Sequence, residues 1–386
     1  MSKTGGNSFY NRDEETQIAW KLLQNEDVLL LAPRRVGKSM LMRHLAEQSQ
    51  NRQETCAVYL TVEGARDEAH FVKILADELK QAAFGRLKRW GHGAKEALSR
   101  IEKIDVASLF GIERQGNEAS QWETAGEELV NCLRGLRGHW VLLVDEFPVF
   151  VQKLLREDTT NQRALNFLNW FRGLRQQPNT GAAGRVSWLL AGSIGLDVVA
   201  SRNLLGTTIN DLKIMDLGPF SRDHAEKFLE KLALDEDVRL SASVSGQICD
   251  AVGWLIPYHL KILFDEWRMK GAANTANAVA EAFASLLDKT PYFDTWHQRL
   301  AEELGRPWDG VARALLNSCA ADVNGAAREV LRQRMSNSGV AWADEEQEFR
   351  WLLEVLRKDG YLVEQSGRFV FRSHLLRAYW HQRFVA

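Results

Sequence analysis

The sequence predicts an α/β protein, in which a three-layer domain with a parallel sheet is followed by a helical lid and a winged-helix domain. Two mostly apolar runs lie at 28–31, before the glycine-containing segment APRRVGKS, and at 139–144, before two acids. Continuously apolar strands are typical of parallel sheets that helices cover on both faces. After residue 310 the pattern changes to short helices and a hairpin. We therefore expect three domains, at 1–220, 221–306 and 307–386.

Composition narrows the class of protein. A chain of 386 residues has room for two or three domains. Its net charge of −2 argues against a wholly basic nucleic-acid coat protein, although a local basic patch stays possible. The four cysteines are far apart, so neither a zinc site nor a disulfide framework is indicated. There is no apolar leader segment and no run of about 18 apolar residues, which predicts a cytoplasmic protein without a membrane span.

The first run belongs to a strand, a loop and a helix. Residues 28–31 are apolar, 32–39 read APRRVGKS, and apolar side chains recur at helical spacing from Met40 onward. The order matches the phosphate-binding pattern G-x-x-x-x-G-K-[ST], with Ala32 in place of the first glycine. This context favours a phosphate-binding loop.

Each loop residue type suits that chemistry. Gly37 allows the backbone N–H groups to face a phosphate. Lys38 would reach the β- and γ-phosphates, and the Ser39 hydroxyl would hold Mg²⁺. The positive end of the following helix adds to the anion site.

The second run, at 139–146, ends in the adjacent carboxylates Asp145 and Glu146. Adjacent acids at the end of a buried strand are poor core residues, because an unpaired buried charge is costly. Asp145 would help to hold Mg²⁺, and Glu146 would polarise the attacking water.

Other segments complete the α/β domain, with the strand of the phosphate loop expected at its centre. We expect three further strands at 56–62, 186–191 and 213–217. We expect four helices around 18–23, 71–79, 122–137 and 167–174. Ser193 follows one strand, where it would contact the γ-phosphate or water, or serve only as a turn residue. The basic stretch within 84–121 is a solvated loop or a partner surface.

The C-terminal third predicts a winged helix. Apolar residues in 349–356 have helical spacing, and two short strands flank 364–367 as a hairpin. Four acids in 344–348 would repel phosphates, so Arg368, Arg372 and Arg377 are the best candidates for contacts to a DNA backbone. A structural or protein-binding wing is the alternative.

Taken together, residues 32–39, 141–146, 192–193 and 217–221 occur in the order seen in AAA+ and STAND-type ATPases. The chain most closely resembles the archaeal-type P-loop ATPases, over nearly its whole length. Residues 10–14 look like the opening motif of these ATPases beside the adenine, with Asn11 where glycine is usual. Residues 253–260 resemble the glycine-proline helix of their lid, where His259 or Lys261 would take the place of a second sensor.

The resemblance implies the site. Nucleotide contacts would come from nine residues: Tyr10, Arg12, Arg34, Arg35, Val36, Gly37, Lys38, Ser39 and Met40. The catalytic residues would be Lys38, Glu146, Ser193 and Arg202, and the metal ligands Ser39 and Asp145. Arg202 lies where AAA+ proteins place an arginine finger that reaches a neighbouring subunit, with Arg163, Arg172 and Arg175 as the next candidates.

The function that follows is an ATP-binding and ATP-hydrolysing switch. Its cofactors would be ATP and Mg²⁺, and it would change conformation, or form a homo-oligomer, with nucleotide state. Two alternatives stay open: a nucleotide-dependent module that binds duplex DNA as initiators do, and a STAND-like signalling or defence scaffold. Duplex DNA or a protein partner would bind through the winged helix.

Overall fold

The computed structural model describes residues 12–90, 99, 119–136, 138–158, 160–177, 184–192 and 205–386. The chain divides into two compact units, one formed by residues 1–31 with 38–216 and the other by residues 32–37 with 217–386. The main division therefore falls at residues 216 and 217. A further division of the second unit near residue 306 stays a prediction.

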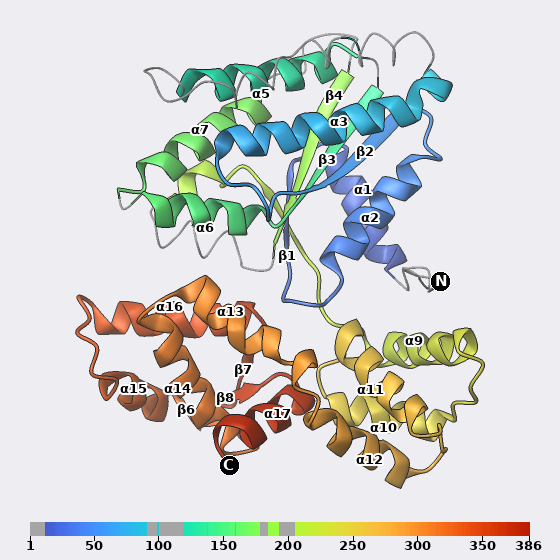
Figure 1. Cartoon of the computed structure of the whole chain (residues 1–386), viewed down its shortest axis with the longest axis vertical. Helices are drawn as coiled ribbons and strands as arrows, with labels where there is room; N and C mark the ends of the chain where they lie inside the picture. The colour runs from blue at the N-terminus through green and yellow to red at the C-terminus, as the bar shows by residue number, and fades with distance from the viewer. Residues whose placement is uncertain are drawn as a thin grey trace. The chain divides into compact units, whose positions relative to one another are not determined.

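The first unit contains a five-stranded sheet in which every neighbouring pair of strands is parallel (Figure 1). Its strands are β1 (Val28–Leu31), β2 (Thr55–Thr61), β3 (Gly138–Asp145), β4 (Gly184–Ala191) and β5 (Lys213–Asp216). The order is β2-β3-β4-β1-β5, so the strand that leads into residues 32–39 lies between β4 and β5. The expectation that this strand lies at the centre of the sheet is wrong, because β4 is the middle strand and only β5 lies on the far side of β1.

Helices cover both faces of this sheet, as a three-layer domain requires. They are α1 (Asp13–Leu23), α2 (Lys38–Ser49), α3 (Glu68–Trp90), α5 (Ala119–Arg134), α6 (Phe147–Glu157) and α7 (Gln162–Gln176), with the 3₁₀ turn η2 (Gly206–Thr208). In Figure 1, α3 crosses in front of the strands. The predicted three-layer α/β domain with a parallel sheet is confirmed.

Alternating residues of the strands face opposite layers. Leu142 of β3 and Trp188 of β4 share one core with α3, α5, α6 and α7. Phe71 lies at its centre, with its ring 5.2 Å from that of Phe167 and 5.4 Å from that of Phe150, measured between centroids. Helices α1 and α2 pack against strands through buried side chains outside that core, among them Leu41.

The second unit begins with a group of helices: α9 (Arg222–Asp235), α10 (Ala242–Val252), α11 (Pro257–Met269), α12 (Ala276–Leu287), the 3₁₀ turn η3 (Thr290–Tyr292) and α13 (Asp294–Leu304). Ser221, Ser241 and Thr275 cap α9, α10 and α12, since each side chain accepts a hydrogen bond from a main-chain N–H of the first turn.

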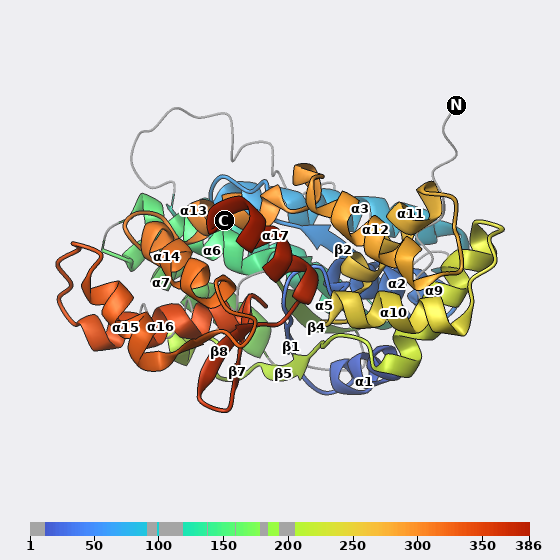
Figure 2. The ribbon, with the colours of Figure 1, turned by 90° about the horizontal axis from the view of Figure 1, so that it is seen from below.

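The C-terminal segment consists of α14 (Trp308–Ala320), β6 (Ala326–Ala327), α15 (Arg328–Ser336), α16 (Glu345–Lys358), β7 (Leu362–Gln365), β8 (Arg368–Phe371) and α17 (His374–Phe384). The three strands pair antiparallel in the order β6-β8-β7. Figure 2 shows the β7–β8 hairpin projecting beside α14–α16, with α9–α12 as a separate group of helices. The helices and the hairpin thus follow in the predicted order, while their assignment as a winged-helix domain stays a prediction.

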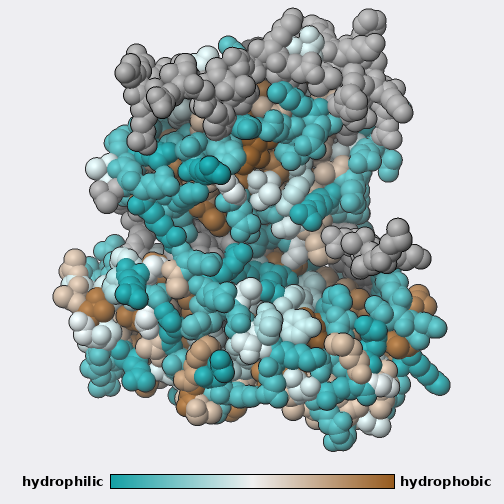
Figure 3. Space-filling view, viewed as in Figure 1, coloured by the Kyte–Doolittle hydropathy of each residue, from teal (hydrophilic) through white to brown (hydrophobic). Residues whose placement is uncertain are grey.

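The surface shows few large apolar residues. On the face seen in Figure 3, hydrophobic side chains form small areas within a mostly hydrophilic surface. In the described part of the chain, the exposed large apolar residues are Ile18, Ile214, Leu234, Met269, Val323 and Val330. None of the described helices is both long enough and apolar enough to span a bilayer.

A histidine is fully buried in the second unit. His259 of α11 lies among aromatic rings, with centroids 5.9 Å from Trp296 and 6.3 Å from Trp254. Neither of its ring nitrogens has a hydrogen-bond partner within the described residues. Burial, aided by the charge of Arg35, lowers the pKa of His259 to about 3. The side chain is thus neutral at physiological pH, and its burial speaks against a role as a sensor of phosphate.

This burial predicts acid sensitivity. In the unfolded chain, His259 takes up a proton near its ordinary pKa of about 6.5, whereas in the folded chain it does so only near pH 3. The contribution of this residue to stability is therefore fully present above pH 6.5 and is lost as the pH falls toward 3. Between pH 7 and 4.5, we expect the free energy of unfolding of His259→Phe to fall by about 2–3 kcal/mol less than that of the wild type. Urea unfolding at the two pH values measures this difference. His224→Gln, at a partly exposed position, is the control. Identical pH dependence in wild type and His259→Phe would contradict this account.

Candidate functional site

The register of the sheet brings two sequence motifs to one edge. Leu190 of β4 pairs with Val144 of β3 on one side and with Leu29 of β1 on the other. The next residues, Asp145 and Leu30, are therefore level across β4, about 10 Å apart at two strand spacings. The loop that leaves β1 and the acids that end β3 thus emerge on either side of the same strand.

The carboxylate of Asp145 is fixed in orientation. It is 2 % exposed, and its Oδ2 accepts a hydrogen bond of 2.9 Å from the Tyr59 hydroxyl of β2. Its Oδ1 accepts a hydrogen bond of 3.0 Å from the main-chain N–H of Glu146. Each carboxylate oxygen has a second acceptor site, so a metal ion can still be bound.

Tyr59 connects this carboxylate to α2. The Arg43 guanidinium of α2 lies over the Tyr59 ring, 4.9 Å from its centroid. Burial, followed by the nearby Asp145 charge, raises the pKa of Tyr59 to about 12. The phenol therefore stays protonated, and donates to Asp145, across the neutral range. Sequence reasoning missed Tyr59 and Arg43, because only the fold brings them to Asp145; a polar-tipped aromatic in an otherwise apolar strand is the available signal.

Glu146 has a strained backbone and a different environment. Its φ of 57° and ψ of 28° are left-handed, and its side chain does not cap α6, which follows. It is partly exposed, whereas Asp145 is buried. Non-glycine residues in this conformation cluster at functional sites, where the surrounding structure holds them. Adjacent carboxylates in unlike environments are suited to different roles.

Helix α2 begins at Lys38, directly after the loop, and packs against β3. Lys38 is 6 % exposed, while Ser39 and Met40 are partly exposed. The first N–H groups of a helix lack partners within the helix and carry partial positive charge, which favours an anion there.

The loop itself, Ala32–Gly37, groups with the second unit. Arg34 and Val36 are buried, and Arg35 and Gly37 are partly exposed. Positive φ angles of 61° at Arg35 and 105° at Gly37 turn the chain. Main-chain N–H groups in such alternating conformations form a concave anion-binding surface.

The end of β4 approaches the start of α6 closely. A Cβ on Gly192 would lie 2.3 Å from Cδ of Pro148, a distance that no side chain tolerates. Glycine is therefore required where β4 ends beside the helix that follows Glu146. Ser193, predicted to take part in the site, follows immediately but lies outside the described residues, as do Arg202 and Tyr10.

Other predicted residues have partners within the molecule. Arg12 is buried, and its Nη1 donates to Glu15 at 2.5 Å. The three reserve candidates for a finger are also engaged: Arg163 pairs with Glu68 and Glu157, Arg172 donates to the Thr207 carbonyl, and Arg175 pairs with Asp211. Lys261 of α11 pairs with Asp265.

The three arginines expected to contact DNA all donate hydrogen bonds to main-chain carbonyls of the C-terminal segment. Nε of Arg368 donates to the Asn324 carbonyl at 2.9 Å, Nε of Arg372 to that of Leu362 at 3.0 Å, and Nη1 of Arg377 to that of Ala320 at 3.0 Å. These contacts favour the structural reading of the wing arginines over the contacts to DNA predicted for them. Around α16, three other arginines, Arg328, Arg332 and Arg350, converge on Glu346.

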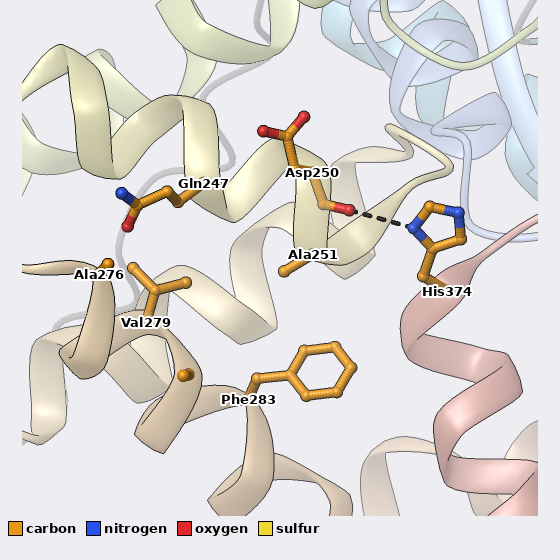
Figure 4. Close-up of a pocket in the computed structure, with 8 residues that line it drawn as sticks. Gln247, Asp250, Ala251, Ala276, Val279, Phe283 and His374 are labelled. Carbon is orange, nitrogen blue, oxygen red and sulfur yellow. Dashed lines mark hydrogen bonds between the residues drawn. The ribbon is translucent and has the colours of Figure 1, made fainter.

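A pocket of about 520 Å³ lies in the second unit, between α10, α12 and α17 (Figure 4). Its walls are mostly apolar, with Ala251, Val279 and Phe283 among them. Nδ1 of His374, at its rim, is 3.1 Å from the Asp250 carbonyl. The lining contains no lysine or arginine, so its chemistry does not suit phosphates.

Comparison with solved structures identifies the fold. A Walker-type ATPase of Pyrococcus abyssi superposes with a TM-score of 0.64 at 16 % identity, over 99 % of this chain and 98 % of that one. The Aeropyrum pernix ORC2 protein, in ADPNP–ADP complexes, superposes with a TM-score of 0.58 at 14 % identity, over the same shares. No model of a protein family matches the sequence, and no curated protein does. The resemblance to archaeal-type P-loop ATPases is confirmed as a likeness of fold across the whole chain.

The contact at Gly192 gives a prediction. Gly192→Ala must displace Pro148, at the start of α6, and overpacking of this kind typically costs about 1–3 kcal/mol of stability. Gly173→Ala is the matched control, since a Cβ there meets nothing within 4 Å and alanine favours the interior of α7. Urea unfolding measures both. Equal stability of Gly192→Ala and wild type would show that the close approach is not needed.

Proposed function

We propose that this protein binds ATP with Mg²⁺ at the loop 32–39, hydrolyses it, and changes conformation or assembly with nucleotide state. The observation that carries the proposal is the sheet register, by which the end of β1, which leads into the loop, and the Asp145–Glu146 pair flank β4 at one edge. The fold shared with a Walker-type ATPase supports it. Crevices at the carboxyl ends of parallel strands are where open α/β sheets bind ligands.

The donor set at this edge fits Mg²⁺. A serine hydroxyl and a carboxylate are hard oxygen ligands, and Mg²⁺ usually takes one or two of these with phosphate oxygens and water. Ser39 and Asp145 would supply them, since Tyr59 and the Glu146 N–H hold the Asp145 carboxylate in place. The metal ion, when bound, would neutralise charge on the β- and γ-phosphates.

Three further residues of the chain would act on the nucleotide. Lys38 would hold the β- and γ-phosphates by charge, with the N–H groups of Gly37 and of the start of α2. Glu146, partly exposed and held by its strained backbone, would orient and polarise the attacking water. Ser193 would contact the γ-phosphate or the attacking water. Arg202 would act as an arginine finger that reaches the nucleotide of a neighbouring subunit.

A second candidate function is nucleotide-dependent binding of duplex DNA, which the winged helix favours. The charges oppose it in part, because Glu345, Glu346 and Glu348 lie in the first turn of α16, the helix that would enter a groove. Sizing chromatography with and without ATP and duplex DNA separates the two. Comigration with DNA favours the second candidate, and ATP-dependent assembly without DNA favours the switch.

Lys38→Ala tests nucleotide binding. Loss of a charged contact to two phosphates should weaken ATP binding by about 100-fold or more, beyond detection in a calorimeter. Lys73→Ala, which removes an exposed lysine of α3, should bind as the wild type does. Unchanged affinity in a folded Lys38→Ala protein would remove the proposed site.

Glu146→Gln tests hydrolysis separately from binding. It should bind ATP as tightly as the wild type and turn it over about 10²–10⁴-fold more slowly, because general-base help is lost while Asp145 is kept. Phosphate release under single-turnover conditions measures this, with Glu63→Gln, an exposed acid just after β2, as the control. Wild-type turnover in Glu146→Gln would exclude Glu146 as the base.

A further inference from the structure

Arg35, in the phosphate loop, is held by two helices of the second unit. Its guanidinium carbon lies 3.7 Å from the centroid of the Tyr258 ring in α11. Its Nη2 donates a hydrogen bond to Oγ1 of Thr295, the second residue of α13. All three residues belong to the same compact unit.

The residues that receive Arg35 are themselves fixed. The Tyr258 hydroxyl donates to the Tyr292 carbonyl at 2.9 Å, so the ring is anchored at both ends of its side chain. Tyr258 follows Pro257, the first residue of α11, and precedes the fully buried His259. Arginine over an aromatic face is attracted by the ring quadrupole, and more strongly where water is excluded.

A second contact holds the same loop. Gly360, with a φ of 90°, follows α16, and a Cβ there would lie 3.0 Å from Cβ of Pro33 and 2.4 Å from the Trp254 ring. Pro33 and Arg35 thus both lie against residues of the second unit, one on each side of Arg34.

The backbone of Arg35 makes these contacts significant. Its φ of 61° is a conformation that glycine adopts without strain and that arginine rarely adopts. The chain therefore has arginine where the local backbone alone favours glycine. Contacts of the side chain must compensate for the strain.

On the premise of the proposed nucleotide site, we propose that Arg35 is a positioning residue for phosphate binding. Its side chain, held by Tyr258 and Thr295, keeps the loop in the conformation that directs main-chain N–H groups toward the phosphates. Nucleotide affinity then depends on α11 and α13, far along the chain from the loop.

Variants separate strain from positioning. Arg35→Gly removes the backbone strain together with the side chain. If local strain alone governed the loop, this variant would bind nucleotide as well as the wild type or better. We expect instead that Arg35→Gly and Tyr258→Leu each weaken MgADP binding at least tenfold by calorimetry. Tyr258→Phe, which keeps the ring, should stay within threefold of the wild type. The double variant Arg35→Gly/Tyr258→Leu should bind no worse than either single one, since both remove the same contact.

Two controls accompany these variants. Arg334→Ala removes an exposed arginine of α15 and tests whether loss of one positive charge alone matters. It should leave the affinity for MgADP unchanged. Hydrogen exchange of the loop amides without nucleotide should be faster in Arg35→Gly and Tyr258→Leu than in wild type and Tyr258→Phe.

The outcomes distinguish the two proposals. A wild type without affinity for MgADP or MgATP overturns the nucleotide site and this inference together. A wild type that binds, with undiminished affinity in folded Arg35→Gly, overturns only the positioning role. Additive losses in the double variant, or loop exchange that does not change, also overturn it.

Discussion

Parallel pairing of β1 and β3 with β4 is the constraint on which the first unit depends. Parallel neighbours cannot be joined by tight turns, so each connection crosses the sheet through helices. Those helices cover both faces, which is why the strands can be almost wholly apolar. The same constraint brings the carboxyl ends of three consecutive strands to one edge. The apolar core and the polar edge thus have a common origin in chain direction.

The aromatic core beneath this edge explains how strained residues are tolerated. Phe147 follows Glu146 directly and packs against Phe71, Phe167 and Phe171, with centroids 5.1–6.2 Å apart. These rings fix the start of α6, so the left-handed backbone of Glu146 is set from the far side of the helix. Close packing of this kind transmits displacement rather than absorbing it. The position of the acid pair therefore depends on buried aromatic residues that lie away from the polar edge.

Sequence patterns gave the strands and their ends because continuous apolar runs and terminal acids are local signals. Strand order could not be predicted in this way, because a local run of residues does not show to which side of the sheet each connection crosses. For this reason β1 was wrongly expected at the centre. Helix α6, which begins directly after the two acids, was not predicted, although Pro148 in its first turn suits the start of a helix. Helix α15 was missed because only Leu331 and Met335 are buried in it. Tyr59 required a tertiary contact to become meaningful.

The division of the chain has a consequence for how the two units can be separated. The polypeptide passes from the first unit to the second at residue 31, returns at 37, and leaves again at 216. A fragment ending at residue 216 would contain Lys38, Asp145 and Glu146, yet its loop would lack Tyr258, Thr295 and Gly360, the residues against which it packs. The halves are consequently not interchangeable modules. A recombination event at the obvious boundary would exchange the surroundings of the loop along with the second unit, so the two parts are expected to evolve as a pair.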